Sequence, residues 1–423
     1  MRVLVVGGGG REHALAWVLA RSPLVEEVLA APGNAGIEEV ARCVPVEADD
    51  VDGIVELADQ ESVDLTVVGP EAPLVAGLVD ALQDRGRPAF GPTARAARVE
   101  GSKVWAKQLC LRHGIPTARA EIVDDVTRAV MLLDAFEPPF VVKADGLAAG
   151  KGVVVAADRQ EAVQAIEAAL VDRAFGTAGD RVLIEEHLDG REVSALALTD
   201  GRTVVPLVLA QDFKRAFDGD AGPNTGGMGA CSPVPFVDGT TEARIHADIL
   251  KATVRALAEE GIEYRGVLYA GLMLTDDGPK VLEFNARFGD PETQAILLRL
   301  RSDLAEEARA AAGGDLGGRA LEWSPEACVT VVLASGGYPG AYRTGLEITG
   351  LESATKLPGV TVFHAGTARR NGKLVTAGGR ALGVSGVGKD LASARERAYE
   401  ACSVIDFEGM HYRTDIALEG ARA

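Results

Sequence analysis

The sequence predicts an α/β protein with three parts: a doubly wound N-terminal domain, a larger central domain that carries a small α+β lid, and a small β-rich C-terminal domain. The chain has 423 residues, which is more than one ordinary hydrophobic core accommodates. Hydrophobic residues make up 47% of it, so large cores can form. Short apolar runs alternate with helical patterns, and this alternation favours parallel sheets covered by helices.

The first hundred residues show this alternation most clearly. Val3 to Val6 predict a buried strand, and the run from Ala14 to Ala20 has helical composition. Further strands are expected at Val28–Ala31 and Leu65–Val68, where they end in the turns "APGN" and "GPEAP". We therefore predict a doubly wound α/β domain over residues 1–102.

The central domain is expected over residues 103–325, with the lid over residues 116–188. Strands and helices alternate in the lid as "TARAEIV", "VTRAVMLLDAF", "FVVKAD", the loop "GLAAGKG", "VVVAAD" and "EAVQAIEAAL", and "DRVLIEEHL" is the strand leading out. Residues 190–290 are rich in strands, which include "VLYAGLML" and "KVLEFN". The C-terminal domain, residues 326–423, begins near "VTVVLASGGYPG" and includes a predicted helix from Leu391 to Ser403.

Composition and charge exclude several classes of function. A formal charge of −19 argues against nucleic-acid binding, because such proteins concentrate Lys and Arg on one face. No apolar run approaches the roughly 20 residues that span a bilayer, and the start "MRVLVVGGGGREHAL" has too few apolar residues for a secretory signal. We expect a cytoplasmic monomer with no nucleic-acid or membrane partner. The five cysteines and six histidines are scattered without ligand-like spacing, so oxygens must hold any metal.

A glycine cluster, Gly7–Gly10, follows the first predicted strand and precedes a helix. Such a turn presents backbone N–H groups and the positive end of the helix dipole to an anion. A dinucleotide site also needs an acidic residue about 20 residues further on, at the end of the second strand, where this sequence has "APGN". A phosphorylated sugar is therefore the preferred ligand, and a purely structural turn is the alternative.

A second glycine loop lies within "KADGLAAGKGVVV". Lys143 ends one predicted strand, Lys151 lies in the loop, and the next strand begins at Val153. A P-loop would lead from a strand into a helix and would read GxxxxGK[ST], whereas Gly152 follows Lys151 here. We predict a hairpin flap whose N–H groups and lysines close over a triphosphate. A solvated Gly-Lys turn is the alternative.

The strand "KVLEFN" carries two oxygen-bearing side chains at a spacing of two residues. This spacing places Glu283 and Asn285 on one face, with Leu282 and Phe284 on the other. Carboxylate and amide oxygens are ligands that Mg²⁺ prefers, alongside water and nucleotide phosphates. A capped acidic residue at the end of a strand would look the same, so the pattern alone leaves both interpretations open.

The turn "ARFGDPET" adds an arginine and an aspartate directly after this strand. Arg287 can hold a carboxylate or phosphoryl oxygen with its planar fork of donors. Asp290 can cap a helix in which Pro291 occupies the first position, or it can contact substrate. Arg287→Ala and Glu283→Ala are expected to lose most turnover while remaining folded.

Together these motifs resemble the ATP-grasp ligases, and within them the phosphoribosylamine-glycine ligase (glycinamide ribonucleotide synthetase) family of de novo purine synthesis. The similarity covers essentially the full length, and "RFGDPE" is its most specific segment. The resemblance implies a pre-ATP-grasp domain, an ATP-grasp core with its lid, and a C-terminal domain that closes the substrate cleft. The motifs that carry it, in order, are "VLVVGGGGREHALAW", "APGNAG", "VVGPEAPL", "EGSK", "KADGLAAGKGV", "GPNTGGMGA", "VLYAGLM" and "LEFNARFGDPETQ".

The resemblance assigns a nucleotide and metal site to particular residues. It implies ATP as the nucleotide, and Mg²⁺, or Mn²⁺ in its place, bound by Glu283 and Asn285. The residues that match the family's phosphate lysines and flap are Lys103, Lys143, Gly150, Lys151 and Gly152. The residues that match the adenine-reading strand and hinge are Glu185, Glu186 and Leu188, and Glu192 matches the ribose-binding carboxylate.

The resemblance also implies the substrates, glycine and 5-phosphoribosylamine. The phosphoribosylamine would contact Gly9, Gly10 and Arg11 through its phosphate, and Glu71 near its sugar hydroxyls. Glycine would lie near the catalytic residues Asp212, Lys214, Arg287 and Asp290, beside a loop that includes Asn224, Gly226 and Gly227. Two positions depart from the family's usual residues: Phe213 stands where His is common, and Cys231 where Tyr is common.

The reaction that this resemblance implies proceeds through glycyl phosphate, which the amine of phosphoribosylamine attacks. Alignment, charge stabilisation and exclusion of water suffice for this chemistry, so no enzyme nucleophile is needed. Three alternatives remain at this point: another ATP-grasp enzyme such as a biotin carboxylase or a purine-pathway carboxylase subunit, a dehydrogenase, and a non-catalytic nucleotide-sensing module.

Overall fold

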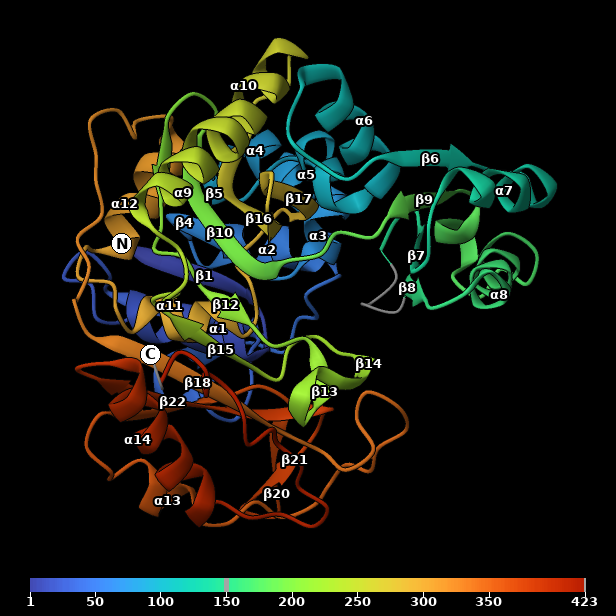
Figure 1. Cartoon of the computed structure of the whole chain (residues 1–423). Coiled ribbons are helices and arrows are strands. Elements are labelled where there is room, and N and C mark those ends of the chain that lie inside the picture. The colour runs from blue at the N-terminus through green and yellow to red at the C-terminus, as the bar shows by residue number, and fades with distance from the viewer. Residues whose placement is uncertain (148–151, 422–423) are drawn as a thin grey trace.

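Figure 1 shows the computed structural model of the chain, which describes residues 1–147 and 152–421. The N-terminal part is a five-stranded sheet in the order β3-β2-β1-β4-β5, and its strands are parallel, as the sequence predicts. Its strands are β1 (Arg2–Gly7), β2 (Glu27–Pro32), β3 (Arg42–Cys43), β4 (Leu65–Val68) and β5 (Ala89–Phe90). Its helices are α1 (Gly10–Leu19), α2 (Val51–Gln60), α3 (Glu71–Ala76), α4 (Leu78–Asp84) and α5 (Ala94–Gly101).

Alternating side chains of β1 divide between two hydrophobic layers, because successive residues of a strand face opposite sides. Leu4 and Val6 pack in one cluster with Ile54 of α2, and Val3 and Val5 pack in another with residues of α1. Helices therefore cover both faces of the sheet, which makes the domain doubly wound.

The central part is built on a four-stranded antiparallel sheet in the order β11-β10-β16-β17. Its inner side chains, such as Ala195 and Leu268, belong to the same hydrophobic cluster as Leu4 of β1, so the N-terminal and central parts share a core. The strands are β10 (Arg191–Asp200), β11 (Val204–Pro206), β16 (Arg265–Thr275) and β17 (Gly278–Asn285). The helices are α6 (Lys103–His113), α9 (Gly239–Arg244), the π-helical turn Ile245–Lys251, α10 (Ala252–Glu259), α11 (Glu292–Leu297) and α12 (Leu304–Gly313).

The lid projects from the body as a separate α+β unit (Figure 1). Its sheet has the order β6-β9-β7-β8 and its own hydrophobic core. Strand β9 lies between β6 and β7, so the segment expected to lead out of the lid is an inner strand of its sheet. The elements are β6 (Ala120–Val123), α7 (Val126–Leu132), β7 (Phe140–Ala144), β8 (Val153–Ala156), α8 (Arg159–Leu170) and β9 (Val182–Glu186).

The C-terminal sheet contains two strands that come from the middle of the sequence. Its order is β12-β15-β18-β22-β19, and Cys231 of β15 pairs with Val329 of β18. The three-part division with a boundary at residue 325 stays a prediction, and this sheet crosses that boundary. Its strands are β12 (Gln211–Asp212), β15 (Gly229–Ser232), β18 (Ala327–Ala334), β19 (Val360–His364) and β22 (Arg380–Gly388), with helices α13 (Leu351–Ala354) and α14 (Leu391–Val404) beside it.

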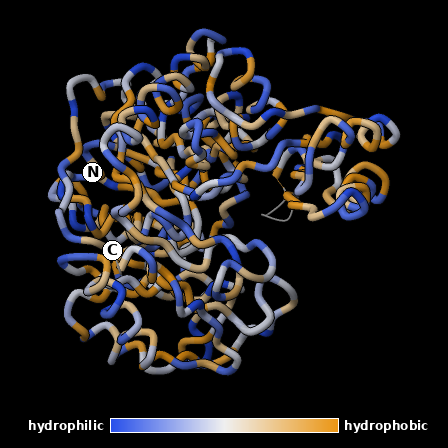
Figure 2. The backbone as a smooth tube through the Cα atoms, viewed as in Figure 1, coloured by the Kyte–Doolittle hydropathy of each residue, from blue (hydrophilic) through white to orange (hydrophobic). Residues whose placement is uncertain are grey.

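Two short hairpins complete the fold: β13 (Arg215–Phe217) with β14 (Ala221–Asn224), and β20 (Thr367–Arg370) with β21 (Lys373–Thr376). Figure 2 shows hydrophobic stretches running through the strands inside the body and hydrophilic stretches in many outer loops. None of the helices in residues 1–147 and 152–421 combines the length and apolarity needed to cross a membrane.

Two buried histidines join the N-terminal domain to the C-terminal sheet. The backbone N–H of His364 donates to His13 Nδ1 at 2.8 Å, and Nδ1 of the His364 ring lies 3.0 Å from Thr367 Oγ1. Burial lowers the pKa of His13 to about 3, and the neighbouring His364 adds to this shift. Burial also lowers the pKa of His364 to about 4, and the neighbouring Arg369 adds to that shift. Both rings are therefore neutral in the folded protein at neutral pH.

We expect acid to destabilise this junction. The unfolded chain binds protons at the ordinary histidine pKa near 6.5, whereas the folded rings do not, so stability falls as pH drops below about 6.5. Each ring contributes a loss of about 2 kcal/mol between pH 7 and pH 5. Urea unfolding at the two pH values measures this loss, and His13→Asn, which keeps an acceptor for the His364 N–H, should reduce it by about 2 kcal/mol. An unchanged pH dependence in His13→Asn would contradict the assignment.

Candidate active site at the lid and central sheet

A cavity of about 620 Å³ lies where the lid, the N-terminal domain, the central sheet and the C-terminal part meet. Gly9, Gly10 and Gly227 are absent from its described lining, and Gly150 and Lys151 lie outside the described residues. The predicted site residues that line it are Arg11, Glu71, Lys103, Lys143, Gly152, Glu185, Glu186, Leu188, Glu192, Asp212, Lys214, Asn224, Gly226, Glu283, Asn285, Arg287 and Asp290.

A buried carboxylate holds two lysines on the lid side of the cavity. Glu185 is 2% exposed, and its carboxylate lies 2.7 Å from Lys143 Nζ and 2.9 Å from Lys107 Nζ. Burial alone would raise the pKa of Glu185, but these two lysines hold it below its ordinary value. The carboxylate is thus engaged with lysines, so Glu185 orients cations at the wall of the cavity. Lys107 was not predicted to be a site residue, although its position four residues after Lys103 places both lysines on one face of α6.

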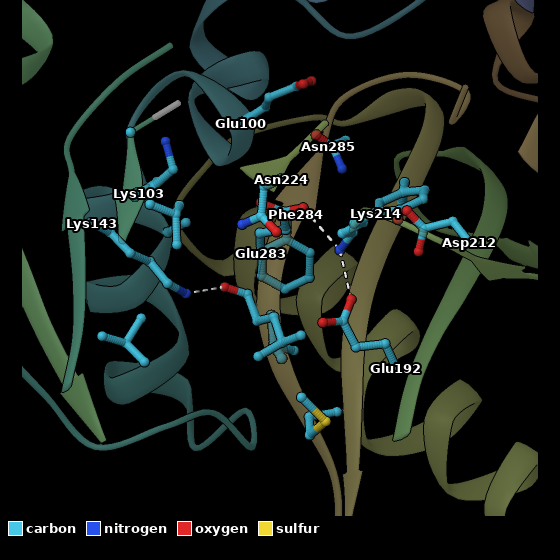
Figure 3. Close-up of a pocket in the computed structure, with 18 of the residues that line it drawn as sticks. Glu100, Lys103, Lys143, Glu192, Asp212, Lys214, Asn224, Glu283, Phe284 and Asn285 are labelled. Carbon is cyan, nitrogen blue, oxygen red and sulfur yellow. Dashed lines mark hydrogen bonds and ion pairs between the residues drawn. The ribbon is translucent and has the colours of Figure 1, made fainter. Parts of the chain in front are cut away.

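The hairpin predicted between Lys143 and Val153 is present. Strands β7 and β8 are antiparallel, and Lys143 pairs with Val153. Lys103 Nζ donates to the Gly146 carbonyl at 2.7 Å, and burial lowers the pKa of Lys103. Figure 3 shows Lys103 and Lys143 on the same side of the strand that carries Glu283. Two ammonium groups therefore face one part of the cavity from different elements.

Strand β17 departs from simple alternation at Leu282. A bulge opposite Gly271 and Leu272 shifts its register, so Leu282 and Glu283 are both partly exposed, whereas Phe284, which also borders the cavity, is buried in the core. The expectation that Leu282 and Phe284 share the face away from Glu283 is therefore wrong for Leu282. The Leu282 carbonyl accepts a hydrogen bond from Lys143 Nζ at 2.9 Å, which links the lid to β17.

Glu283 and Asn285 line the cavity from the end of β17. Burial alone would raise the pKa of Glu283. Its pKa is nevertheless held below the ordinary value by three nearby lysines, Lys214, Lys143 and Lys103. Among the described residues, no three His, Cys, Asp or Glu side chains form a metal-binding cluster. An ionised carboxylate beside one amide oxygen fits Mg²⁺ that takes its remaining ligands from water and nucleotide phosphates.

A lysine lies between two carboxylates on the other side of β17 (Figure 3). Lys214 Nζ is 3.0 Å from Glu192 Oε2 and 3.7 Å from Glu283 Oε1. Burial raises the pKa of the neighbouring Asp212 to about 8, with Glu292, Glu192 and Glu283 adding to the shift against the effect of Lys214. The acidic groups here outnumber the cations, so this part of the cavity favours an added positive charge.

Arg287 is held between two carboxylates from the N-terminal domain. Its Nε lies 3.2 Å from Glu71 Oε2, and its Nη2 lies 3.0 Å from Glu100 Oε1. Glu100 also accepts a hydrogen bond from the Ala286 N–H at 2.6 Å, and burial raises its pKa. Glu100 stands in the "EGSK" motif, but no local pattern in the sequence indicated that it faces Arg287.

Asp290 forms an ion pair and does not cap a helix. Helix α11 begins at Glu292, and no side chain caps its N-terminus. Asp290 Oδ2 lies 3.1 Å from Arg380 Nη2, and its Oδ1 accepts from Gln294 Nε2 at 2.8 Å. Burial alone would raise the pKa of Asp290, but Arg380 and Arg11 hold it below its ordinary value. Arg380 was not identified from the sequence.

The first glycine turn packs against the Asp290 loop. A side chain at Gly10 would come within 2.6 Å of Gln294 Nε2, and one at Gly9 within 2.6 Å of Glu12 Oε2, so either would displace the end of a neighbouring side chain. The Gly9 N–H already donates to Glu12 Oε2 at 2.6 Å, and Arg11 Nε donates to Glu12 Oε1 at 2.6 Å. The turn therefore lies beside the cavity, and Arg11 is its cationic member in the lining.

The two positions that depart from the family's usual residues do not reach the cavity among the described residues. Phe213 packs against the C-terminal core, with the guanidinium carbon of Arg413 5.3 Å from its ring centroid. Cys231 is buried in the C-terminal sheet, and burial raises its pKa to about 12. Both residues are part of the packing that supports the site.

Family models match all three parts of the chain. They are the N domain of phosphoribosylglycinamide synthetase over residues 1–100, its ATP-grasp (A) domain over residues 101–293, and its C domain over residues 328–419. The chain is 48% identical over 417 residues to a phosphoribosylamine–glycine ligase of Caldanaerobacter subterraneus subsp. tengcongensis, with 99% of each chain covered. It is 50% identical over 419 residues to the ligase of that name from Pseudomonas aeruginosa, covering 98% of this chain and 97% of the other.

Solved structures agree with this similarity. A crystal structure of phosphoribosylamine–glycine ligase from Thermotoga maritima matches with a TM-score of 0.87 and 37% identity, covering 99% of this chain and 100% of that one. A biotin carboxylase domain from Hydrogenobacter thermophilus, in complex with MgADP, matches with a TM-score of 0.73 and 17% identity, covering 97% and 91%. The second match shows a common fold.

Proposed function

The chain belongs to the phosphoribosylglycinamide synthetase family, and on that premise we propose how its cavity joins glycine to 5-phosphoribosylamine. The chain is an ATP-dependent ligase of purine biosynthesis. The products of the proposed reaction are glycinamide ribonucleotide, ADP and phosphate. The observation that carries the proposal is one cavity shared by Lys143 of the lid, Lys103 of α6, the oxygen-bearing side chains of β17, and the Arg11 and Glu71 side chains of the N-terminal domain.

The nucleotide occupies the space between the lid and β17. Lys103 and Lys143 offset the charge of its phosphates, and Glu185 and Lys107 keep Lys143 in place. Apolar side chains suited to an adenine ring line the cavity from both sides: Val141 and Val155 from the lid, and Met273 and Leu282 from the central sheet. Glu186 at the end of β9 and Leu188 in the hinge after it contact the adenine, and Glu192 contacts the ribose.

Glu283 and Asn285 would hold Mg²⁺, or Mn²⁺ in its place. The ion supplies positive charge that neutralises the nucleotide phosphates when it is bound. The chain's own groups do the rest of the positioning, because Lys214 keeps Glu283 ionised and directed into the cavity.

The reaction needs an activated carboxylate, because a free carboxylate is a poor acyl donor. A carboxylate oxygen of glycine attacks the γ-phosphorus of ATP, the bond to ADP breaks, and glycyl phosphate forms. The amine of phosphoribosylamine then attacks the acyl carbon, phosphate leaves with the electron pair of the broken bond, and the amine loses a proton. Cys110 lines the cavity, but burial raises its pKa to about 12, so its thiol stays protonated and is no nucleophile.

Glycine and phosphoribosylamine lie in the part of the cavity away from the adenine-binding side chains. The acidic group around Asp212 suits the ammonium of glycine, and Lys214 and Arg287 suit its carboxylate. Phosphoribosylamine lies toward the N-terminal domain, with Arg11 and the Gly9–Gly10 turn near its phosphate and Glu71 near its hydroxyls. Glycine lies near Asp290, beside the loop that carries Asn224, Gly226 and Gly227, where the amine of phosphoribosylamine can reach its activated carboxylate.

ADP formation, assayed with and without glycine and freshly generated phosphoribosylamine, tests the proposal. We expect release of ADP that depends on both substrates. A nucleotide-sensing module would bind ATP without glycine-dependent ADP release, and a dehydrogenase would bind NADH, which fluorescence detects. Either result would reject the proposed reaction.

We propose that the enzyme acts as a cytoplasmic monomer. All residues assigned to the reaction come from one chain, and residues from the lid, body and C-terminal sheet of this chain line the same cavity. Light scattering during gel filtration measures the mass, for which a single chain corresponds to 44.1 kDa.

A further inference from the structure

We propose that Arg380 is a positioning residue of this reaction: from the C-terminal sheet it fixes two loops of the cavity, residues 224–229 and 287–291, in the arrangement that binds glycine. The inference rests on the proposed function for its role in turnover. Arg380 begins β22 and lines the cavity, and 21% of its side chain is exposed.

The guanidinium contacts both loops at once. Its Nη1 donates to the Gly226 carbonyl at 2.6 Å and to the Asp290 carbonyl at 2.8 Å, and a longer contact of 3.4 Å reaches the Gly227 carbonyl. Its Nη2 lies 3.1 Å from Asp290 Oδ2. Gly226 lies 154 residues and Asp290 lies 90 residues from Arg380 in the sequence. One side chain therefore sets the spacing of two segments that are remote in sequence.

A second side chain of the C-terminal part, Tyr338, binds the backbone N–H of Gly226, whose carbonyl Arg380 binds. The Gly226 N–H donates to Tyr338 Oη at 3.0 Å, while its carbonyl accepts from Arg380. A side chain at Gly226 would come within 3.1 Å of the Arg380 guanidinium carbon and 3.3 Å of Tyr338 Oη. The close fit on both sides indicates that the C-terminal part fixes the orientation of this peptide.

Asp290 transmits the same constraint to the N-terminal domain. Its carboxylate is bound by Arg380 on one oxygen and by Gln294 on the other. A side chain at Gly9 or Gly10 would lie 3.8 or 3.7 Å from this carboxylate, so the glycine turn of the N-terminal domain is adjacent. Arg380 thus stands at the meeting point of the three segments that surround the proposed glycine and phosphoribosylamine sites.

Arginine suits this task because its planar fork offers several donors in fixed directions, which a lysine ammonium lacks. The contacts to Asp290 Oδ2 and three carbonyl oxygens use that fork. Arg380→Lys keeps the charge but loses the fixed geometry, and Arg380→Ala loses both. Displacement of positioning groups by about 1 Å is enough to cost about 100-fold. Because the groups displaced here are those proposed to bind glycine, we expect the loss to appear in the KM for glycine.

The kinetic test measures the KM of each substrate in Arg380→Ala, Arg380→Lys and Tyr338→Phe. We expect Arg380→Ala to raise the KM for glycine about 10- to 100-fold while the KM for ATP changes by less than about twofold. Arg380→Lys and Tyr338→Phe should give smaller rises. Arg343→Ala is the matched control, because Arg343 lies in the same part of the chain, pairs with Glu408 and is 70% exposed; its constants should not change.

Hydrogen exchange in the absence of substrates provides a measurement that is independent of turnover. The N–H groups of Gly226, Gly227 and Met228 donate to Tyr338, Thr225 and Phe213, respectively. We expect Arg380→Ala to speed exchange in a peptide covering residues 224–229 by about tenfold relative to Arg343→Ala. Unchanged exchange would overturn the claim that Arg380 holds the loop.

The two measurements separate the ways in which the inference can fail. A lower kcat and melting temperature with an unchanged KM for glycine would show a merely structural residue and overturn it. If the unaltered enzyme lacks glycine-dependent ADP release, the proposed function fails and the role in turnover fails with it, whereas the exchange result still decides whether the loop is held.

Discussion

Glu283→Ala is expected to reduce kcat by about 100- to 1,000-fold, the usual effect of removing a principal electrostatic group from an active site. The change removes one of two oxygen ligands proposed for Mg²⁺ and one of the two carboxylates beside Lys214. Initial rates of ADP formation at saturating glycine, with Mg²⁺ varied, measure the effect. The apparent affinity for Mg²⁺ should fall with kcat, because Asn285 alone is a weak ligand.

The folded structure should survive this substitution. The Glu283 side chain is 35% exposed to the cavity and lies in a cluster with an excess of carboxylates. Asp277→Ala is a matched control, since Asp277 lies in the turn before β17, is 83% exposed and contacts only Lys280 among the ion pairs of the described residues. Near-normal turnover of Glu283→Ala, at a melting temperature close to that of the control, would reject the metal role.

Arg287→Ala is expected to lose turnover to a similar degree and also to lose stability. The structure alters the sequence-based expectation that this variant remains folded, because Arg287 neutralises Glu100, whose side chain is only 6% exposed. Leaving a buried charge without its partner costs about 3 to 5 kcal/mol. Urea unfolding and ADP formation measure the two losses separately.

A second substitution separates stability from catalysis at Arg287. Glu100→Gln removes the buried charge while its amide oxygen can still accept from the Ala286 N–H. The double variant Arg287→Ala/Glu100→Gln should therefore recover most of the lost stability but little of the lost turnover. Recovery of turnover along with stability would show that Arg287 acts only through folding.

Local patterns identified the parts of the site that lie within one element. The strands before the glycine turns, the β7–β8 hairpin and the common exposure of Glu283 and Asn285 all follow from apolar runs, turn residues and the two-residue period of a strand. The two-residue alternation does not hold at Leu282, because a bulge adds a residue to β17 there. No residue type in "KVLEFN" predicts a bulge.

Contacts between distant segments account for what the sequence left undetermined. Tyr338 and Arg380 lie in a loop and a strand for which the sequence suggested no role in the site, and nothing in the "EGSK" motif indicated that Glu100 faces Arg287. The sequence left Asp290 as either a helix cap, which Asp-Pro before a helical pattern favours, or a substrate contact, but Arg380, 90 residues later, binds its carboxylate. Such pairings depend on the tertiary arrangement of the elements, which local spacing does not encode.

The C-terminal sheet also constrains the order in which the protein can mature on the ribosome. Strand β15 pairs with β18, about 100 residues further along, and β18 in turn pairs with β22. Until these later strands emerge from the exit tunnel, the segment that carries Gly229 to Ser232 has an open edge, and such edges invite pairing with other nascent chains. The ATP-grasp part can thus be translated long before the C-terminal side of the cavity forms, and we expect premature termination near residue 325 to leave a product prone to aggregation.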